Sequence, residues 1–155
     1  MAISIGLNPS DLKKLVQSIR EVLSDTVMLS VKIRGFHWNV VGKDFWELHE
    51  LFELQYKALN DAADVLAERI RALGEKSPGS FIEFTRLSQI KEVDGLLSPN
   101  QMIEQLIKDH ESTIQRIREH VKNLQETNDF ESIDMLTGRL YEHGKFAWMV
   151  RSYLS

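Results

Sequence analysis

Four long stretches of the chain repeat apolar residues at intervals of three and four, and this spacing constrains the fold more than any other feature. The stripes span residues 12–36, 48–73, 103–124 and 133–150. Residues at these intervals share one face of an α-helix, so each stretch predicts a long amphipathic helix. No stretch shows the strict alternation that is typical of a strand. We therefore expect an all-α protein.

Capping residues indicate where the first two helices begin and end. Asn8 followed by Pro9 predicts the start of the first helix, because an Asn side chain caps free N–H groups and proline suits the first turn. Asp44 with Glu47 resembles a capping box, which predicts the start of the second helix. Gly74 follows the last apolar residue of the second stripe and predicts the end of that helix.

The connections between the stripes predict how the helices are arranged. Two of them are short, whereas residues 75–97 contain Pro78, Gly79 and Gly95, with an apolar piece at 81–87 that suits one or two helical turns. Ser98 with Gln101 predicts the start of the third helix. A single long crossover between two helix pairs is the connectivity of ferritin-like four-helix bundles, and 155 residues suit one domain, residues 1–155.

Composition excludes several classes of site. The chain has no cysteine, so a metal must be held by nitrogen and oxygen ligands. Lys and Arg number 19 against 23 Asp and Glu, and a net charge of -4 gives no electrostatic reason to hold a polyanion. The chain shows neither a signal peptide pattern nor a stretch of membrane-spanning length, so we expect a cytoplasmic protein.

The second predicted helix carries a face of metal-ligand residue types. His49 with Glu53 and Asp64 with Glu68 are two pairs spaced by four residues, and all four fall within roughly a 100° arc. The apolar residues of this helix centre on a direction roughly 140° away. The four polar side chains are therefore expected to point away from the bundle core.

The length of this helix prevents one chain from gathering all four groups. His49 and Asp64 are separated by about 22 Å at 1.5 Å per residue. If two copies of the helix pack antiparallel about a two-fold axis, the first pair of one chain faces the second pair of the other. Imidazole and carboxylate suit iron, manganese or zinc, and several carboxylates favour oxidisable iron. The pattern predicts ferrous iron oxidation at a shared site.

A solvated helix face is the competing interpretation of these residues. With 27% charged residues, a pair such as Asp64 and Glu68 on one helix is common by chance. A different interpretation, a centre inside the bundle, would require Glu-x-x-His pairs. No histidine of this chain has Glu three positions before it, which argues against an intrabundle di-iron centre.

The segment that precedes this helix favours the metal interpretation. Residues 36–42 read Phe-His-Trp-Asn-Val-Val-Gly and lead into Phe45 and His49. This pattern resembles the Dps family, also called mini-ferritins, and similar residues extend through the fourth helix. The resemblance implies that His37, His49 and Glu53 of one subunit join Asp64 and Glu68 of its two-fold mate around iron.

The resemblance also implies an assembly and an activity. It implies a hollow shell of twelve subunits, a ferroxidase that prefers hydrogen peroxide, and a stored ferric mineral, with other divalent metals able to occupy the same ligands. Family pores at three-fold axes suggest Asp134, and more weakly Asp129, as pore residues. Trp38 is a candidate redox side chain near the iron, although packing explains an interface tryptophan equally well. Glu53 departs from the Asp that is usual in the family, so its role as a direct ligand is open.

A non-catalytic, DNA-binding protein on the same shell is the alternative function, and it would place the protein at the nucleoid. Some family members hold DNA with a lysine-rich tail, whereas here no Lys or Arg precedes Lys13. We therefore expect weak or absent DNA binding.

Three further histidines lie outside the predicted metal face. His110 falls within the apolar stripe of the third helix, where we expect a hydrogen-bonded core residue. We expect His120 and His143 on polar or boundary faces.

Overall fold

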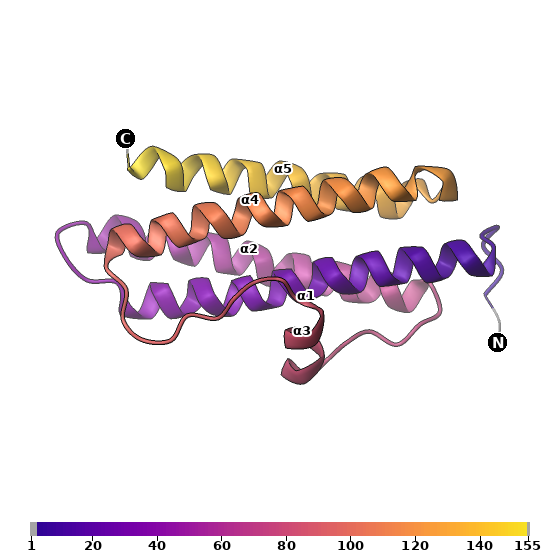
Figure 1. Ribbon diagram of the computed structural model, residues 1–155, viewed down its shortest axis with the longest axis horizontal. Coiled ribbons are helices and arrows are strands. Elements are labelled where there is room, and N and C mark those ends of the chain that lie inside the picture. The colour runs from indigo at the N-terminus through magenta and orange to yellow at the C-terminus, as the bar shows by residue number, and fades with distance from the viewer. Residues whose placement is uncertain (1–2, 155) are drawn as a thin grey trace.

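The computed structural model describes residues 3–154, and within that range it contains helices and no strand. Four long helices and one short helix follow in chain order (Figure 1). Their bounds are Pro9–Asn39 for α1, Phe45–Ala72 for α2, Phe81–Leu87 for α3, Pro99–Leu124 for α4 and Phe130–Tyr153 for α5, with a single 3-10 turn, η1, at Gln125–Thr127. The predicted fold class is confirmed, including the short helix in the crossover.

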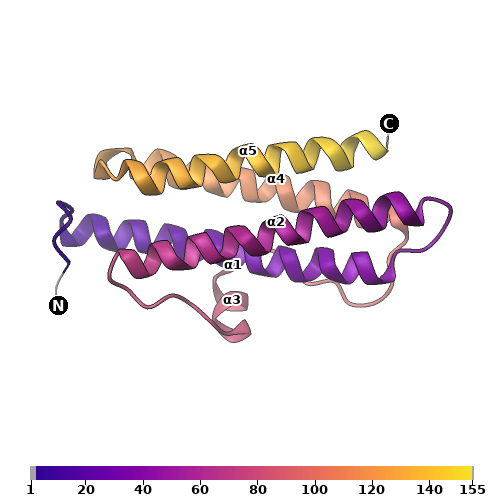
Figure 2. The ribbon, with the colours of Figure 1, turned by 180° about the vertical axis from the view of Figure 1, so that it is seen from behind.

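The long helices form two antiparallel hairpins that pack side by side. One hairpin is α1 with α2, and the other is α4 with α5 (Figures 1 and 2). The connection from α2 to α4 returns along the outside of α1 and carries α3, which contacts α1. No helix in residues 3–154 has an apolar stretch of the length that crossing a bilayer requires.

The apolar stripes meet along the axis of the bundle. The inward residues of α2 are all 2% exposed or less, as their spacing predicts: Leu48, Phe52, Leu59, Leu66, Ile70 and Leu73. They contribute to two core clusters, one toward each end of the bundle. Burying one such side chain contributes about 1.5–3 kcal/mol, so the stripes dominate the stability of the fold.

Three of the predicted helix boundaries are confirmed by their hydrogen bonds. The Asn8 side chain accepts the N–H of Asp11 at 2.9 Å, and Ser98 with Gln101 forms a complete capping box. Gly74 has a φ of +88°, the left-handed conformation that ends a helix, and the N–H of Glu75 donates to the carbonyl of Ile70.

The capping box predicted at Asp44 is wrong. The Asp44 side chain makes no capping hydrogen bond and instead accepts the hydroxyl proton of Tyr153 at 2.7 Å. Tyr153 is the last residue of α5, so this bond joins the end of the second hairpin to the start of α2. The Asp44 side chain therefore bonds to a distant residue and not to the nearby backbone N–H groups. Spacing in the sequence could not predict this choice of partner.

Arg69 joins α2 to the beginning of α5. Its guanidinium donates to both carboxylate oxygens of Asp129, at 2.8 and 2.9 Å, and to the Ser132 hydroxyl at 2.8 Å. Arg69 and Asp129 are both buried, and Glu131 adds an exposed carboxylate to the same guanidinium. Such a buried pair is costly to break, since removing one partner leaves an unpaired charge in the interior.

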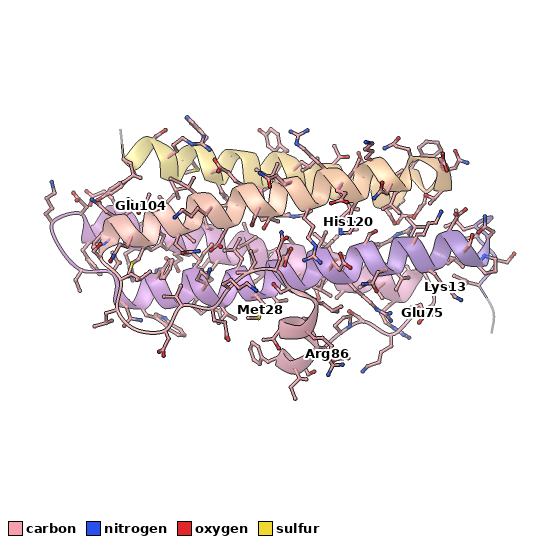
Figure 3. The ribbon with its side chains drawn as sticks, viewed as in Figure 1. Lys13, Met28, Glu75, Arg86, Glu104 and His120 are labelled. Carbon is pink, nitrogen blue, oxygen red and sulfur yellow. The ribbon has the colours of Figure 1, made fainter. Side chains whose placement is uncertain are left out.

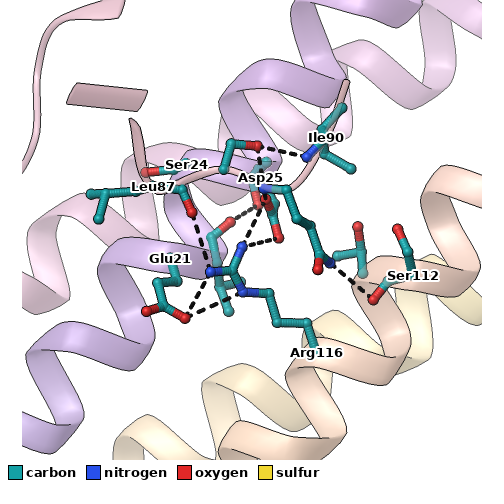
Figure 4. Close-up of polar contacts among 12 residues, drawn as sticks. Glu21, Ser24, Asp25, Leu87, Ile90, Ser112 and Arg116 are labelled. Carbon is teal, nitrogen blue, oxygen red and sulfur yellow. Dashed lines mark hydrogen bonds and ion pairs between the residues drawn. The ribbon is translucent and has the colours of Figure 1, made fainter. Parts of the chain in front are cut away.

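Arg116 of α4 fixes the crossover to the bundle (Figure 4). It donates to the buried carboxylate of Asp25 at 3.0 Å and to the carbonyl of Leu87 at the end of α3. Asp25 also accepts the Ser88 hydroxyl and the Gln89 N–H, each at 2.8 Å. The position of α3 is therefore set by hydrogen bonds to α1 and α4.

A chain of polar groups crosses the core between the hairpins. His110 Nε2 lies 3.1 Å from Gln55 Oε1, and His110 Nδ1 lies 3.0 Å from His143 Nδ1. The expected core position of His110 is confirmed. The polar or boundary position expected for His143 is wrong, since His143 is fully buried, whereas His120 is half-buried beside Glu21, as a boundary position requires. Burial lowers the pKa of His110 to about 3 and holds the pKa of His143 well below its ordinary value.

The two buried histidines should make the protein less stable in mild acid, at pH values above those at which carboxylates titrate. In the unfolded chain each imidazole takes up a proton near pH 6.5, whereas the folded protein keeps both neutral. The unfolded state then binds more protons, so the free energy of unfolding should fall by about 2 kcal/mol between pH 7 and pH 5.5. Urea denaturation at fixed protein concentration measures this slope, and an unchanged midpoint across that range would contradict the prediction.

Candidate metal centre

The hairpin of α1 and α2 brings two histidines together near its turn. His37 lies in the last turn of α1 and is 8% exposed, and His49 lies in the second turn of α2 and is half-buried. Val40 is buried in the turn between the helices, and Gly42 permits a φ of +116° there. The tight turn therefore places two side chains that are twelve residues apart against each other.

The two imidazoles are held by reciprocal hydrogen bonds. His37 Nδ1 lies 2.8 Å from the carbonyl oxygen of His49, and His49 Nδ1 lies 2.9 Å from the carbonyl oxygen of His37. The rings are stacked, with centroids 3.7 Å apart and planes inclined by 19°. Each ring is thus fixed by the backbone of the other helix.

These hydrogen bonds decide which nitrogen of each ring can bind a metal. A carbonyl oxygen only accepts, so each Nδ1 carries the proton and donates it. Each Nε2 is then left with its lone pair. A histidine whose other ring nitrogen donates to a backbone carbonyl is the usual arrangement at protein metal sites. The hairpin therefore presents two oriented Nε2 donors.

Glu53 lies one helical turn after His49, on the same side of α2. Its carboxylate pairs with the Lys57 ammonium, with Oε1 2.5 Å from Nζ. Lys57 holds the pKa of Glu53 below its ordinary value, and the nearby His37 and His49 act in the same direction. Glu53 is therefore an ionised carboxylate near both imidazoles, and it carries a cation as its partner.

Asp64 and Glu68 lie further along α2 and are exposed. Because α2 is continuous from Phe45 to Ala72, the predicted separation of about 22 Å between His49 and Asp64 applies. Within residues 3–154 of one chain, no group of three or more His, Asp or Glu is arranged to hold a metal ion. In Figure 2, α2 lies on the near side of the bundle, and the exposed fractions place Asp64 and Glu68 on its outer surface.

Aromatic side chains surround the two histidines. The Tyr56 ring meets His37 edge-on at 5.3 Å, and the Phe45 ring lies 5.0 Å from His49. Trp38 and Trp46 are 70% and 68% exposed, so neither packs into the core of its own chain. Tyr56 is in direct contact with the candidate centre, whereas Trp38 makes no ring contact with either histidine among those found in residues 3–154.

The two pore candidates differ in their surroundings. Asp134 is exposed on α5, whereas Asp129 is buried and bound to Arg69. A carboxylate that neutralises a buried guanidinium is not available to attract ions from water. The geometry therefore favours Asp134 and gives Asp129 a structural role.

The sequence interpretation did not include two features of the site. The first feature is the pair of reciprocal hydrogen bonds between His37 and His49. Their spacing in the sequence does not indicate these bonds, because the bonds depend on the geometry of the folded hairpin. The second feature is Lys57, which pairs with Glu53. The sequence contains a signal for this pair, because a Glu followed by Lys four residues later commonly forms an ion pair on a helix.

Comparison with known proteins identifies the family. A ferritin-like domain model matches residues 16–155. The chain is 32% identical to DNA protection during starvation protein 2 of Bacillus anthracis over 92% of this chain and 98% of the relative. It superimposes on the Dps protein of Vibrio cholerae O1 with a TM-score of 0.93, at 29% identity, covering 100% of this chain and 98% of the other. The chain belongs to the Dps family of ferritin-like proteins.

Two further comparisons cover nearly the whole chain. The Dps structure of Staphylococcus aureus matches with a TM-score of 0.89 at 31% identity, covering 97% of this chain and 99% of that one. An uncharacterized low temperature-induced protein of Nostoc sp. (strain PCC 7120) is 38% identical over 98% of this chain and 86% of the relative. The Vibrio cholerae protein is described as one of the ferritin-like diiron-carboxylate proteins.

The tautomers of His37 and His49 can be tested in this Dps protein without metal. Solid-state NMR of histidine-labelled protein at pH 8 should show both rings with a proton on Nδ1 and none on Nε2. His37→Phe and His49→Phe variants assign the signals. A proton on Nε2 of either ring would contradict the proposed orientation of the donor atoms.

Proposed function

We propose that this Dps protein is a ferroxidase and iron store, which oxidises ferrous iron at sites shared between two chains and keeps the ferric product as a mineral. The reciprocal hydrogen bonds of His37 and His49 carry the proposal, because they use both Nδ1 atoms and leave both Nε2 atoms with a lone pair for a metal. The ionised carboxylate of Glu53 lies near both rings, which a pair formed only for stability would not require.

The proposed site needs a second copy of the chain. One chain supplies His37, His49 and Glu53, and its two-fold mate supplies Asp64 and Glu68, so that each dimer has two equivalent sites. Two neutral imidazoles with three carboxylates suit ferrous iron and favour its oxidised state, because anionic oxygen ligands stabilise the higher charge. Manganese or zinc fits the same ligands.

Exposed apolar side chains on the same hairpin and on α3 support this pairing. A monomer rarely leaves several large apolar residues exposed without a partner. The exposed residues in this region include Val31, Trp38, Trp46, Val65, Phe81 and Ile82. A partner chain over this region would bury apolar surface while it completes the metal site.

Hydrogen peroxide is the proposed oxidant. Two ferrous ions each give up one electron, the O–O bond breaks, and the two oxygen atoms take up two protons and leave as water. No hydroxyl radical is released when both electrons arrive together. Oxidation and protection are therefore the same reaction, and we place it in the cytoplasm.

Storage requires an enclosed space and a path for iron. We propose a shell of twelve chains, as the family resemblance implies, with Asp134 lining the pores through which ferrous ions enter. An exposed carboxylate attracts cations and can release them, because it remains hydrated. Trp38 is retained as a candidate electron donor whose position depends on the partner chain.

Co-assembly of two inactive variants tests whether the sites are shared. His49→Ala breaks one half of the site, and Asp64→Ala with Glu68→Ala breaks the other. Each homo-oligomer should lose rapid peroxide-driven iron oxidation. In a randomly mixed assembly half of the dimers are mixed, and each of these has one intact site, so the initial rate should recover to about a quarter of the wild-type rate.

Two outcomes would overturn this proposal. Wild-type rates in either homo-oligomer would remove those residues from the site. No recovery on mixing, with light scattering showing intact mixed shells, would exclude sharing between chains. Shells mixed from His37→Ala and His49→Ala chains are the matched control and should stay inactive, because both changes affect the same half-site.

DNA binding should be weak or absent in this Dps protein. Twelve chains at a net charge of -4 would carry about -48, which repels a polyanion unless divalent ions intervene. A gel-shift assay at moderate salt without magnesium should show no retarded DNA. Tight binding under those conditions would instead favour a DNA-protecting role at the nucleoid.

A further inference from the structure

We propose that Lys57 is the counter-ion of the empty iron site, and that ferrous iron must displace its ammonium from Glu53 in order to bind. This inference rests on the proposed function, since it assigns a role to a residue that neighbours the proposed ligands. It makes Lys57 a positioning residue that sets how tightly the site holds iron.

The position of Lys57 supports this role. Its Nζ is 2.5 Å from Glu53 Oε1, and its side chain is 63% exposed while that of Glu53 is 30% exposed. Lys57 follows Glu53 by four residues on α2, so both side chains lie on the open face of the helix. The ammonium therefore occupies a carboxylate oxygen that a metal ion would use.

Glu53 is suited to this pairing by its length. A Glu side chain reaches a Lys four residues later along a helix, and this order of the two residues gives the more favourable pair. An Asp side chain would place its carboxylate one methylene closer to the backbone. The longer side chain lets Glu53 contact Lys57 and leaves it free to turn toward the imidazoles.

Charge explains why an empty site of this composition needs a cation. Glu53 would face Asp64 and Glu68 of the mate, and three carboxylates in a site without metal repel one another. The Lys57 ammonium offsets one of these charges. When ferrous iron enters, it replaces the ammonium, and the energy of the lost ion pair is subtracted from the energy of metal binding.

An ion pair that only stabilises the helix would behave differently. Exposed pairs of this kind stabilise a helix only weakly and do not affect a ligand. Under that interpretation, removal of Lys57 would slightly destabilise the protein and leave metal affinity unchanged. Under our proposal, removal of the charge increases metal affinity.

Equilibrium binding of Co²⁺ to the assembled wild-type and variant proteins distinguishes a purely stabilising ion pair from a counter-ion of the metal site. Lys57→Met keeps the length of the side chain and removes its charge, and it should tighten Co²⁺ binding about tenfold, which corresponds to about 1.4 kcal/mol. Lys57→Arg keeps the charge and should bind as the wild type does. Lys108→Met is the matched control, since Lys108 is exposed on α4, one turn after Glu104 (Figure 3), in the other hairpin, and should have no effect.

A second background tests whether Lys57 acts through Glu53. In Glu53→Gln protein the ammonium has no carboxylate to occupy, so adding Lys57→Met should change Co²⁺ affinity less than twofold. Unchanged affinity in the Lys57→Met single variant, or an equal gain in both backgrounds, would overturn the proposal. A His49→Ala variant separates failure of the proposed role of Lys57 from failure of the proposed function. Co²⁺ binding that survives this change would overturn the proposed function itself.

Discussion

The hydrogen bonds that His37 and His49 exchange with each other's backbone are the contact on which the proposed chemistry depends. They link the last turn of α1 to the beginning of α2, and they fix two ring orientations with one arrangement of the hairpin. Because both Nδ1 atoms are used internally, both Nε2 atoms remain for a ligand. The same contact that closes the hairpin therefore orients two ligands of the proposed metal site.

The rest of the fold holds this hairpin in place through a few polar contacts between elements. Tyr153 ties the end of α5 to Asp44 beside the turn, and Arg69 ties α2 to the start of α5. Arg116 fixes the crossover, and with it α3, whose exposed apolar residues belong to the proposed contact between chains. The core supplies most of the stability, and these contacts set the relative positions of the helices.

The sequence could predict the helices and the open face of α2 because both follow from local periodicity. Boundaries at Asn8, Gly74 and Ser98 were predictable for the same reason, since their caps are formed by neighbouring residues. Asp44 precedes the first residue of α2 as predicted, but its capping bond is absent because Tyr153, 109 positions away, donates to its side chain. The burial of His143 was missed because its partner, His110, lies on another helix.

The sequence by itself determined the fold class, because helical rise and spacing are local properties of the backbone. The same spacing indicates the candidate ligands, and the sharing of the site between two chains stays a prediction. Only the tertiary structure decided which imidazole nitrogens are free and that Asp129 is bound to Arg69. Those features depend on the direction in which side chains meet across elements. Residue order does not specify that direction until the helices have packed.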